Sequence, residues 1–444
     1  MFDYSIATAL ATAFLSGVWD AEAAAARGAW TLGHKWRWLG PLAGRMVRYF
    51  AGPTRPRHRD VVDFLLLDDG YGNAFERHGP RVKVVHRIGE EGPSMQPGEA
   101  AAGWPVRSIK SPVELARWLE LPLTELEWFA DLKCYLTRRH TPQALRHYHY
   151  RVMAKDSGSI RLIEAPKDRL KDIQLKVLRE TLDRIPPHDV AHGFRKGRSI
   201  RTFAEPHTGQ RVVLKLDLQD FFPSIRRNRV QALFRTAGYP EGVADLLGGL
   251  CTSATPREIW GATADPSDPN RVAWAKGMYA APHLPQGAPT SPAIANLCAY
   301  RFDSRLSGLA TAAGAEYTRY ADDLAFSGGD EFARGVERFS VWATAILLEE
   351  GFEVHSRKTR IMRQGVRQQL AGLVVNEHAN IRRSDFDELK AILTNCVRLG
   401  PQTQNRAGHA DFRAHLDGRV GFVESIRPER GAKLRAIFNK IDWH

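Results

Sequence analysis

The stretch Glu316-Tyr-Thr-Arg-Tyr-Ala-Asp-Asp-Leu-Ala-Phe-Ser-Gly328 decides how the rest of this chain is interpreted. Runs rich in Tyr, Thr, Leu and Phe flank Ala321-Asp322-Asp323, and this composition is typical of two strands joined by a tight turn. The pattern predicts a hairpin with two adjacent carboxylates at its tip. Adjacent Asp residues are more often solvated turn residues than ligands, so the pair alone does not establish a site.

A third carboxylate comes from residues 211–225, which read Arg-Val-Val-Leu-Lys-Leu-Asp-Leu-Gln-Asp-Phe-Phe-Pro-Ser-Ile. The β-branched and apolar run brings Asp217 to the end of a predicted strand that Pro223 closes. If the two units lie side by side, Asp217 joins Asp322 and Asp323, and the cluster stays ionised only when cations take up its charge. Such all-oxygen clusters suit Mg²⁺ bound through a few carboxylates and substrate phosphates. The chemistry that uses them is in-line phosphoryl transfer with two metal ions.

Three segments in this order resemble reverse transcriptases. Tyr320-Ala-Asp-Asp323 is similar to the catalytic box of that family, and Asp217 to Ile225 resembles its first carboxylate motif. Residues 284–296, Leu-Pro-Gln-Gly-Ala-Pro-Thr-Ser-Pro-Ala-Ile-Ala-Asn, are similar to its template and nucleotide-binding motif. Within this family, the residues of these motifs resemble those of bacterial retron reverse transcriptases most, and the similarity covers about residues 140–444.

The resemblance implies an α+β right-hand polymerase fold. Fingers are expected at residues 101–210, a palm with an antiparallel sheet at 211–376 and a helical thumb at 377–444. Residues 253–283 form a loop-like insertion in the palm, and residues 1–100 are predicted to be a mostly helical N-terminal extension.

The resemblance also implies roles for individual residues. It makes Asp217, Asp322 and Asp323 catalytic, and it places them around the metal together with Leu218. It implies nucleotide contacts for Lys155, Arg161, Phe222, Gln286, Gly287 and Lys358. It implies RNA or template contacts for Arg195, Lys196, Arg198, His207, Asn296 and Arg301.

Physical chemistry supports several of the nucleotide contacts. A guanidinium such as Arg161 suits a phosphate fork, and Gly287 permits close backbone approach to a ligand. The resemblance places a bulky side chain under the sugar at Phe222, where a ring would collide with a ribose 2′-hydroxyl. Because Phe221 and Phe222 alternate across the predicted strand, only one of them is expected to face the site. Lys358 could be a general acid, a fixed charge near the leaving pyrophosphate or an ordinary surface lysine.

Two positions depart from the retron pattern. Phe203 stands where retron enzymes carry Asn, although Ala204 and His207 match. Leu370-Ala371-Gly372 stands where the retron segment reads Val-Thr-Gly. These departures leave open a defence or group II intron-like reverse transcriptase outside the retrons.

Composition agrees with a nucleic-acid partner. The chain of 444 residues has a formal net charge of +13, which favours a polyanion, although a merely soluble basic protein has the same property. Its four cysteines show neither zinc-ligand spacing nor a disulfide framework, which suits a reducing cytoplasm. No run of about twenty apolar residues predicts a transmembrane helix, and Tyr4 to Trp19 is interpreted as the start of a docked or interfacial helix.

Aromatic and cationic residues alternate in the N-terminal extension. Trp30, Trp36 and Trp38 lie amid Lys35 and Arg37. These rings could stack on bases while the cations neutralise phosphates. Alternatively, they belong to amphipathic helices whose tryptophans face the core, which is the commoner arrangement.

The sequence thus predicts an RNA-directed DNA polymerase of retron type. By resemblance, it would use Mg²⁺, with Mn²⁺ as an alternative, and dNTPs to copy a structured non-coding RNA into single-stranded, RNA-linked DNA primed by an RNA 2′-hydroxyl. The resemblance further implies an effector protein and a role in defence against phage. An alternative of another class is a catalytically silent RNA-binding scaffold, against which the retained carboxylates and Gln286 argue.

Overall fold

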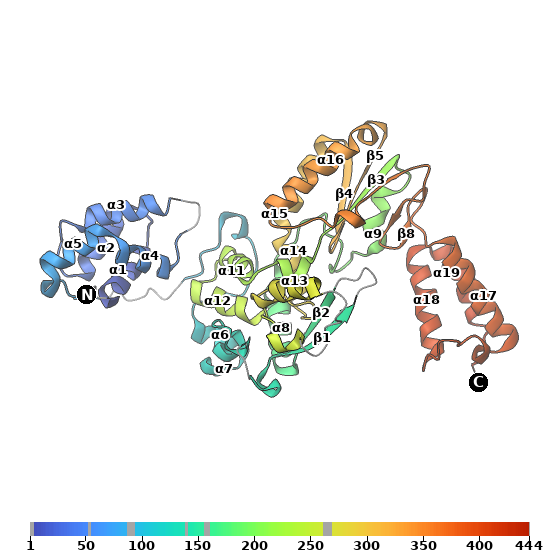
Figure 1. The fold of residues 1–444 in the computed structure, drawn as a ribbon, viewed down its shortest axis with the longest axis horizontal. Helices are drawn as coiled ribbons and strands as arrows, with labels where there is room; N and C mark the ends of the chain where they lie inside the picture. Colours follow the sequence, from blue (N-terminus) through green and yellow to red (C-terminus); the bar gives the residue numbers. More distant parts are fainter. Residues whose placement is uncertain are drawn as a thin grey trace. The chain divides into compact units, whose positions relative to one another are not determined.

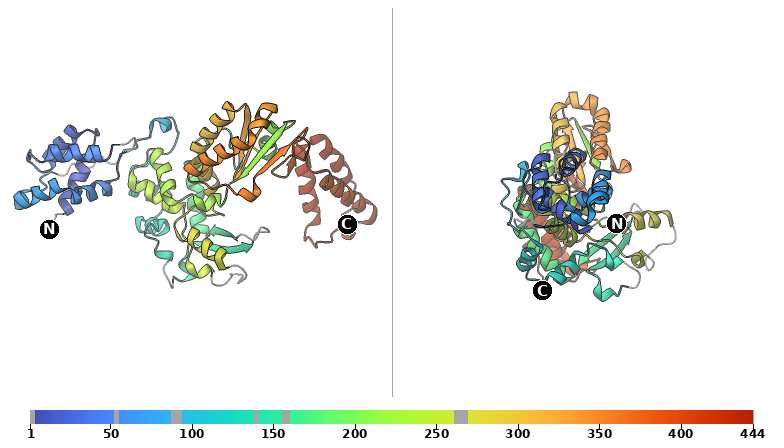
Figure 2. Two further views of the ribbon diagram at one scale, coloured as in Figure 1. Left: turned by 45° about the horizontal axis from the view of Figure 1, so that its top comes forward. Right: turned by 90° about the vertical axis from the view of Figure 1, so that its left-hand side faces the viewer.

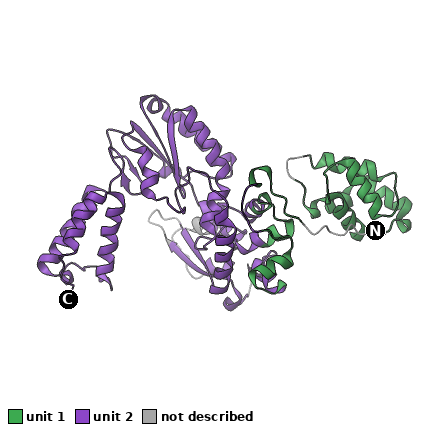
Figure 3. Cartoon of the chain, turned by 180° about the vertical axis from the view of Figure 1, so that it is seen from behind, with its two compact units in different colours: residues 1–102, 108–123, 234–246 green, residues 103–107, 124–233, 247–444 purple. Residues whose placement is uncertain are grey.

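The computed structural model describes residues 4–51, 55–86, 94–137, 141–154, 160–260 and 269–443. The chain forms two compact units (Figure 3). Unit 1 comprises Met1–Ala102, Ser108–Leu123 and Phe234–Leu246, and unit 2 comprises Gly103–Arg107, Thr124–Leu233 and Leu247–His444. Unit 1 therefore takes in short segments that the sequence analysis assigned to the fingers and palm, and the finer division of unit 2 stays a prediction.

Unit 1 is helical, as the sequence predicts. Its helices are α1 (Tyr4–Leu15), α2 (Ala21–Thr31), α3 (Leu39–Tyr49), α4 (His58–Leu67), α5 (Asp69–His78) and α6 (Pro112–Leu119). The Asp20 carboxylate caps α2 by accepting the backbone N–H groups of Glu22 and Ala23, both at 3.0 Å. Leu10 and Phe14 of α1 are fully buried in the unit's core, so this segment is a docked helix.

The tryptophans of unit 1 divide between core and surface. Trp36 and Trp38 pack against the hydrophobic core of the unit. Trp30 is 51% exposed, and its ring stacks on His86 at a centroid separation of 4.8 Å. The core interpretation therefore holds for two of the three rings. None of the described helices combines the length and apolar character needed to cross a membrane.

Unit 2 is built around a four-stranded antiparallel sheet in the order β4-β5-β3-β6 (Figure 1). Its strands are β3 (Val212–Asp217), β4 (Ala315–Tyr320), β5 (Asp323–Gly328) and β6 (Arg360–Arg363). Helices α15 (Tyr300–Ala312) and α16 (Asp330–Glu349) lie along the sheet (Figure 2). The ring of Phe326 stacks on Tyr317 at 4.6 Å and meets Phe339 of α16 at 5.0 Å, so the aromatic residues of these strands form the core on that face.

The opposite face of the sheet carries the polar residues. Side chains alternate along a strand, so Val213, Lys215 and Asp217 share one face of β3. Val213 and Ala325 bury that face in a second cluster, which also contains Phe203, Leu370 and residues of the C-terminal helices. Lys215 and Asp217 continue the same face beyond this cluster. Both faces of the sheet therefore carry core residues, and the alternation along β3 places Lys215 and Asp217 on the face opposite Phe326 and Tyr317.

The remaining elements of unit 2 surround this sheet. The helices before the sheet hairpin are α7 (Leu123–Ala130), α8 (Asp168–Glu180), α9 (Ile200–Ala204), α10 (Phe221–Ser224), α11 (Arg227–Thr236), α12 (Glu241–Leu250), α13 (Pro269–Ala280) and α14 (Ser291–Cys298). Helix α11 ends within the segment Phe234–Leu246 of unit 1, and α12 begins within it. Strands β1 (Tyr148–Ala154) and β2 (Ile160–Pro166) form a separate antiparallel pair. The C-terminal helices are α17 (Arg383–Leu399), α18 (Phe412–Ile426) and α19 (Pro428–Phe438).

Two local predictions are wrong. Residues 253–283 were expected to be loop-like, but α13 occupies 269–280 of this segment, and Tyr279 and Trp260 pack with Leu162 of β2. Phe221 and Phe222 do not alternate along a strand. The strand ends at Asp217, and Asp220, with a φ of +46°, turns the chain into the short helix α10, which also contains Pro223.

The two departures from the retron pattern have structural explanations. Phe203 is fully buried and its ring lies 5.8 Å from Tyr320, so an apolar side chain fits this position. Ala371 and Gly372 link β7 (Gln369–Leu370) to β8 (Leu373–Val374), with φ angles of +44° and +87°. Positive φ at both turn residues is the geometry of a two-residue hairpin, which favours Gly.

Candidate active site

The carboxylates meet where β3 ends and β5 begins. Strand β4 stops at Tyr320 and β5 starts at Asp323, so Ala321 and Asp322 form the turn, as predicted. Asp217 and Asp323 are directly opposite each other in the β3–β5 ladder. The Leu218 backbone N–H donates to the Asp322 carbonyl oxygen at 2.9 Å, which fixes the turn against the end of β3. The expectation that Asp217 meets the hairpin tip is confirmed.

Two lysines neutralise two of these carboxylates. The Lys358 ammonium nitrogen lies 2.9 and 3.1 Å from the two carboxylate oxygens of Asp217. The Lys215 ammonium nitrogen lies 2.8 Å from Oδ1 of Asp323. Lys215 was not singled out from the sequence, although its position two residues before Asp217 on a strand places it on the carboxylate face.

Burial and mutual repulsion disfavour the charged forms of the hairpin carboxylates. Burial raises the pKa of Asp322, and the neighbouring charges of Asp323 and Asp217 raise it further. Burial also raises the pKa of Asp323, which the Lys215 ammonium opposes. A cation placed among these oxygens would relieve both the desolvation and the repulsion.

A cavity of about 690 Å³ opens in front of Asp217 and Asp322. Residues predicted from the sequence that line it are Asp217, Leu218, Asp322, Arg161, Phe222, Gln286 and Lys358. Further lining residues, which the sequence analysis did not identify as site residues, are Ile160, Phe194, Gln219, Asp220, Phe221, Pro223, Trp274, Tyr279, Ala321 and His355. Trp274 and Tyr279 belong to α13, so the wrong loop prediction for 253–283 hid this wall of the cavity. Lys155 lies outside the described residues.

The loop that carries Gln286 is fixed to strand β2. The Glu164 backbone N–H donates to the Gln286 carbonyl oxygen at 2.9 Å, and the φ of Gly287 is +134°. A Cβ atom at Gly287 would lie 2.9 Å from the Glu164 carbonyl oxygen, which only glycine avoids. The buried Glu164 carboxylate also lies 2.7 Å from His283. Gly287 thus allows its loop to approach the backbone of β2 closely. Gln286, in this loop, and Arg161, in β2, line the same cavity.

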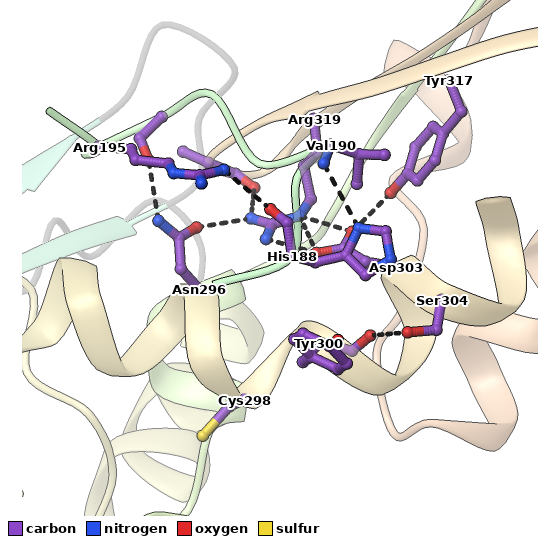
Figure 4. Close-up of polar contacts among 12 residues, drawn as sticks. His188, Val190, Arg195, Asn296, Cys298, Tyr300, Asp303, Ser304, Tyr317 and Arg319 are labelled. Carbon is purple, nitrogen blue, oxygen red and sulfur yellow. Dashed lines mark hydrogen bonds and ion pairs between the residues drawn. The ribbon is translucent and has the colours of Figure 1, made fainter. Parts of the chain in front are cut away.

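The predicted RNA contacts of His207 and Asn296 are wrong, because both side chains are buried. His207 is fully buried between Ser327 Oγ at 2.7 Å and Thr318 Oγ1 at 2.8 Å, and burial lowers its pKa to about 3. Asn296 is buried, and its amide bonds to Gly193 and Arg319 (Figure 4). Both side chains are committed to internal hydrogen bonds, so neither faces a template.

The other predicted RNA contacts lie at the surface or in ion pairs. Lys196 and Arg198 are exposed. Arg195 lies 3.2 Å from Asp189, and Arg301 lies 3.1 Å from Glu350. Their contact with RNA stays a prediction.

The donor atoms fit a divalent cation, although no complete cage is preformed. Asp217, Asp322 and Leu218 face the cavity, and carboxylate and carbonyl oxygens are suitable ligands for Mg²⁺. Within the described residues, no group of three or more His, Cys, Asp or Glu side chains is arranged to hold a metal ion. Asp323 is instead paired with Lys215. Substrate phosphates would complete the coordination of ions that the protein holds through few ligands.

Fold and site together define a class of protein. An antiparallel sheet presents carboxylates from its two central strands at one end of the sheet, in front of a cavity that also contains an arginine, a lysine and an amide. This is the arrangement of a template-directed nucleic-acid polymerase, whose chemistry depends on positioning and electrostatic stabilisation of a phosphoryl group.

Comparison with known proteins identifies the family. The family model for "Reverse transcriptase (RNA-dependent DNA polymerase)" matches residues 153–382. The chain is 42% identical over 298 residues to the retron Mx65 reverse transcriptase of Myxococcus xanthus and 38% identical over 348 residues to the retron Mx162 enzyme of that species. It is 30% identical over 300 residues to the retron Ec86 reverse transcriptase of Escherichia coli. The chain belongs to the reverse transcriptase family.

These matches cover most of this chain and a smaller share of two relatives. They span 66%, 75% and 66% of this chain, in the same order. They span 65% of the Mx65 enzyme, 67% of the Mx162 enzyme and 82% of the Ec86 enzyme. The three relatives named above are retron reverse transcriptases, which agrees with the resemblance drawn from the sequence motifs.

Proposed function

We propose that this protein is a retron-type RNA-directed DNA polymerase that copies part of a structured non-coding RNA into single-stranded DNA. The observation that carries the proposal is the pairing of Asp217 with the Asp322-Asp323 turn beside a cavity that Gln286 and Arg161 also line. The net charge of +13 agrees with an RNA and DNA partner.

Asp217 and Asp322 would hold two Mg²⁺ ions, with the Leu218 backbone nearby. Bound divalent cations make the attacking sugar hydroxyl a better nucleophile and neutralise charge on the phosphate that is transferred. Arg161 would bind the triphosphate of a dNTP, and Gln286 would orient the nucleotide. Lys358 pairs with Asp217 in this structure and would exchange that carboxylate for phosphate oxygens when cations bind.

The aromatic ring of Phe222 would select deoxynucleotides. Phe222 lines the cavity from α10, while Phe221 is buried and lies 5.7 Å from the ring of Phe352. Phe221 also touches the cavity, so both rings reach it, and the expectation that only one of them faces the site is not supported. Phe222 is the less buried of the two and is therefore the candidate for the sugar gate. A bulky ring beneath the sugar excludes a 2′-hydroxyl by steric overlap.

The double variant Asp322→Asn, Asp323→Asn tests the catalytic assignment. We expect it to abolish Mg²⁺-dependent incorporation of dNTPs on a primed RNA template and to leave RNA binding largely intact. Asp330→Asn is the matched control, because the Asp330 side chain is 70% exposed and does not line the cavity. Unchanged polymerisation by the double variant would exclude these aspartates from catalysis.

The nucleic acid that copurifies with the protein tests the retron assignment. Sequencing should find a structured RNA and short DNA covalently linked to it, primed from an RNA 2′-hydroxyl. Copurified RNA without linked DNA, from a protein active on primed templates, would instead indicate a reverse transcriptase outside the retrons. We also propose, from the family resemblance, a role in phage defence with an effector protein, which phage plating with and without the Asp322→Asn change would test.

A further inference from the structure

A fully buried arginine stands directly behind the catalytic turn. Arg319 is the largest fully buried side chain among the described residues, and its partner Asp303 is equally inaccessible. The guanidinium donates to both carboxylate oxygens of Asp303, at distances between 2.7 and 3.1 Å, and the Tyr317 hydroxyl donates to the same carboxylate at 2.7 Å (Figure 4). The buried pair is therefore hydrogen-bonded on both sides.

Arg319 also holds the backbone of the turn. Its Nη1 donates to the Ala321 carbonyl oxygen at 3.1 Å and to Asn296 Oδ1 at 3.0 Å. Ala321 has a φ of +56°, a conformation that costs energy in residues other than glycine and persists where surroundings enforce it. The next residue is Asp322, whose carbonyl oxygen accepts the Leu218 N–H at 2.9 Å. The carbonyl oxygens of both turn residues, Ala321 and Asp322, thus accept hydrogen bonds from outside the turn.

The same residues anchor the loop that precedes α9. The Arg319 N–H donates to the Val190 carbonyl oxygen at 2.8 Å, and the His192 N–H donates to the Arg319 carbonyl oxygen at 2.7 Å. Asn296 Nδ2 donates to the Gly193 carbonyl oxygen at 2.8 Å. A Cβ atom at Gly193 would lie only 2.6 Å from the Ala321 nitrogen, so the loop and the turn are in direct contact.

This loop continues into exposed cations. Lys196 and Arg198 follow Gly193 within five residues and are exposed, and they are the residues predicted to grip template phosphates. Arg195 adds a third cation to this loop, and burial, with a contribution from the charges of Arg198 and Arg195, lowers the pKa of His192 to about 4. One buried cluster therefore contacts both the metal-holding turn and the base of the basic loop.

We infer that Arg319 and Asn296 are positioning residues that couple the basic template-binding loop to the geometry of Asp322. The inference rests on the proposed function and adds residues that touch neither substrate nor metal. Stability alone does not explain a buried Arg–Asp pair, because well-packed apolar residues of similar volume often stabilise a fold as well or better. What apolar residues could not supply is the fork of donors that fixes Ala321, Asn296 and Asp303 together.

Asn296→Ala tests the coupling without leaving a buried charge unpaired. We expect it to raise the Mg²⁺ concentration for half-maximal dNTP incorporation, and the Kd for a DNA primer on an RNA template, each about 5- to 10-fold, as expected for the loss of one or two hydrogen bonds. The Kd is measured by fluorescence anisotropy without divalent cations. Asn376→Ala is the matched control, because Asn376 also bonds to backbone groups, of Val366 and Gln368, away from the turn, and it should change neither value.

Arg319→Lys supplies a second test that keeps a cation for Asp303. It removes the planar fork, so the Mg²⁺ requirement should rise at least as much as for Asn296→Ala. A purely structural role would lower the active fraction and the maximal rate while both half-saturation values stayed at the wild-type level. That result for folded Asn296→Ala, judged by its circular dichroism, would refute the inference.

The failure of the inference and the failure of the proposed function are distinguishable. If Asp322→Asn is inactive while Asn296→Ala leaves both half-saturation values unchanged, only the positioning role is refuted. If the wild-type protein incorporates no dNTPs on a primed RNA template with Mg²⁺, the proposed function itself is refuted, whereas wild-type synthesis by Asp322→Asn would refute the catalytic role of Asp322.

Discussion

Replacing Gly287 with alanine should damage both stability and nucleotide binding. The φ of Gly287 is +134°, and residues with a Cβ in such a conformation are strained by about 1–3 kcal/mol. The new Cβ would also lie 2.9 Å from the Glu164 carbonyl oxygen and 3.2 Å from its carbonyl carbon. Both atoms belong to the backbone of β2, so no side-chain rotation relieves the overlap. Together these effects should lower the free energy of unfolding by about 2–4 kcal/mol.

The functional loss follows from the same contact. Moving the two backbones apart breaks the hydrogen bond from the Glu164 N–H to the Gln286 carbonyl oxygen, now 2.9 Å long. Gln286 would then shift relative to Arg161, which lies on the same strand as Glu164. We expect the KM for a dNTP to rise roughly 10-fold, the equivalent of about 1.4 kcal/mol.

Urea unfolding followed by tryptophan fluorescence measures the stability change, and single-nucleotide incorporation measures the KM. Gly365→Ala is the matched control, since a Cβ there would meet no heavy atom within 4 Å and its φ is not positive. Gly335→Ala, in the interior of α16 and equally free of contacts, should stabilise the protein by up to about 1 kcal/mol. Wild-type stability and KM in Gly287→Ala would refute the close approach between these backbones.

Three further predictions concern the same unit. His207 has a folded pKa of about 3, below that of an unfolded histidine, so the unfolded chain takes up a proton first as pH falls. Stability should therefore fall below about pH 6.5, by about 2 kcal/mol at pH 5 relative to the same pH series for His207→Gln; parallel urea-unfolding profiles would contradict this. Phe222→Val should raise ribonucleotide incorporation relative to deoxynucleotide incorporation at least about 10-fold in competition assays, and unchanged discrimination would remove the sugar-gate role. Lys215→Met should cost about 3 kcal/mol, because it leaves the Asp323 carboxylate buried without a partner, and adding Asp323→Asn should restore most of that loss in the same unfolding assay. An additive double variant would show that the pair is not coupled.

The carboxylate strands were predictable because their signals are local. A β-branched and apolar run at 212–217 and runs rich in Tyr, Thr, Leu and Phe within 316–328 indicate strands, and the turn at Ala321-Asp322 lies between the latter two runs. The segment containing α13 was not predictable in this way, since it includes Gly277 and begins after residues rich in Pro and Asp. Its helix is stabilised by the contacts of Trp260 and Tyr279 with β2, which the sequence does not reveal.

Roles that depend on burial were also beyond the sequence. His207 and Asn296 carry polar side chains that could equally contact RNA or bridge backbone groups, and only the surrounding elements decide between these. The fully buried Arg319 within the catalytic hairpin is the clearest example. Arg319 lies in β4, and its partners Asp303 and Asn296 come from α15 and α14, so nothing in its local sequence distinguishes it from an exposed arginine.

The distribution of charge explains how the site can fold before cations bind. Asp217 is paired with Lys358 and Asp323 with Lys215, while Asp322 makes no ion pair within the described residues. Each of these two carboxylates therefore has a lysine partner in the folded protein. Under the proposed function, a divalent cation in the cavity would meet Asp322 without a competing lysine, and it would reach Asp217 if Lys358, whose side chain is 45% exposed, moved towards solvent or phosphate. Lys215 projects from β3 to Asp323, so we expect Asp322 to bind the cation while Asp323 stays paired with Lys215.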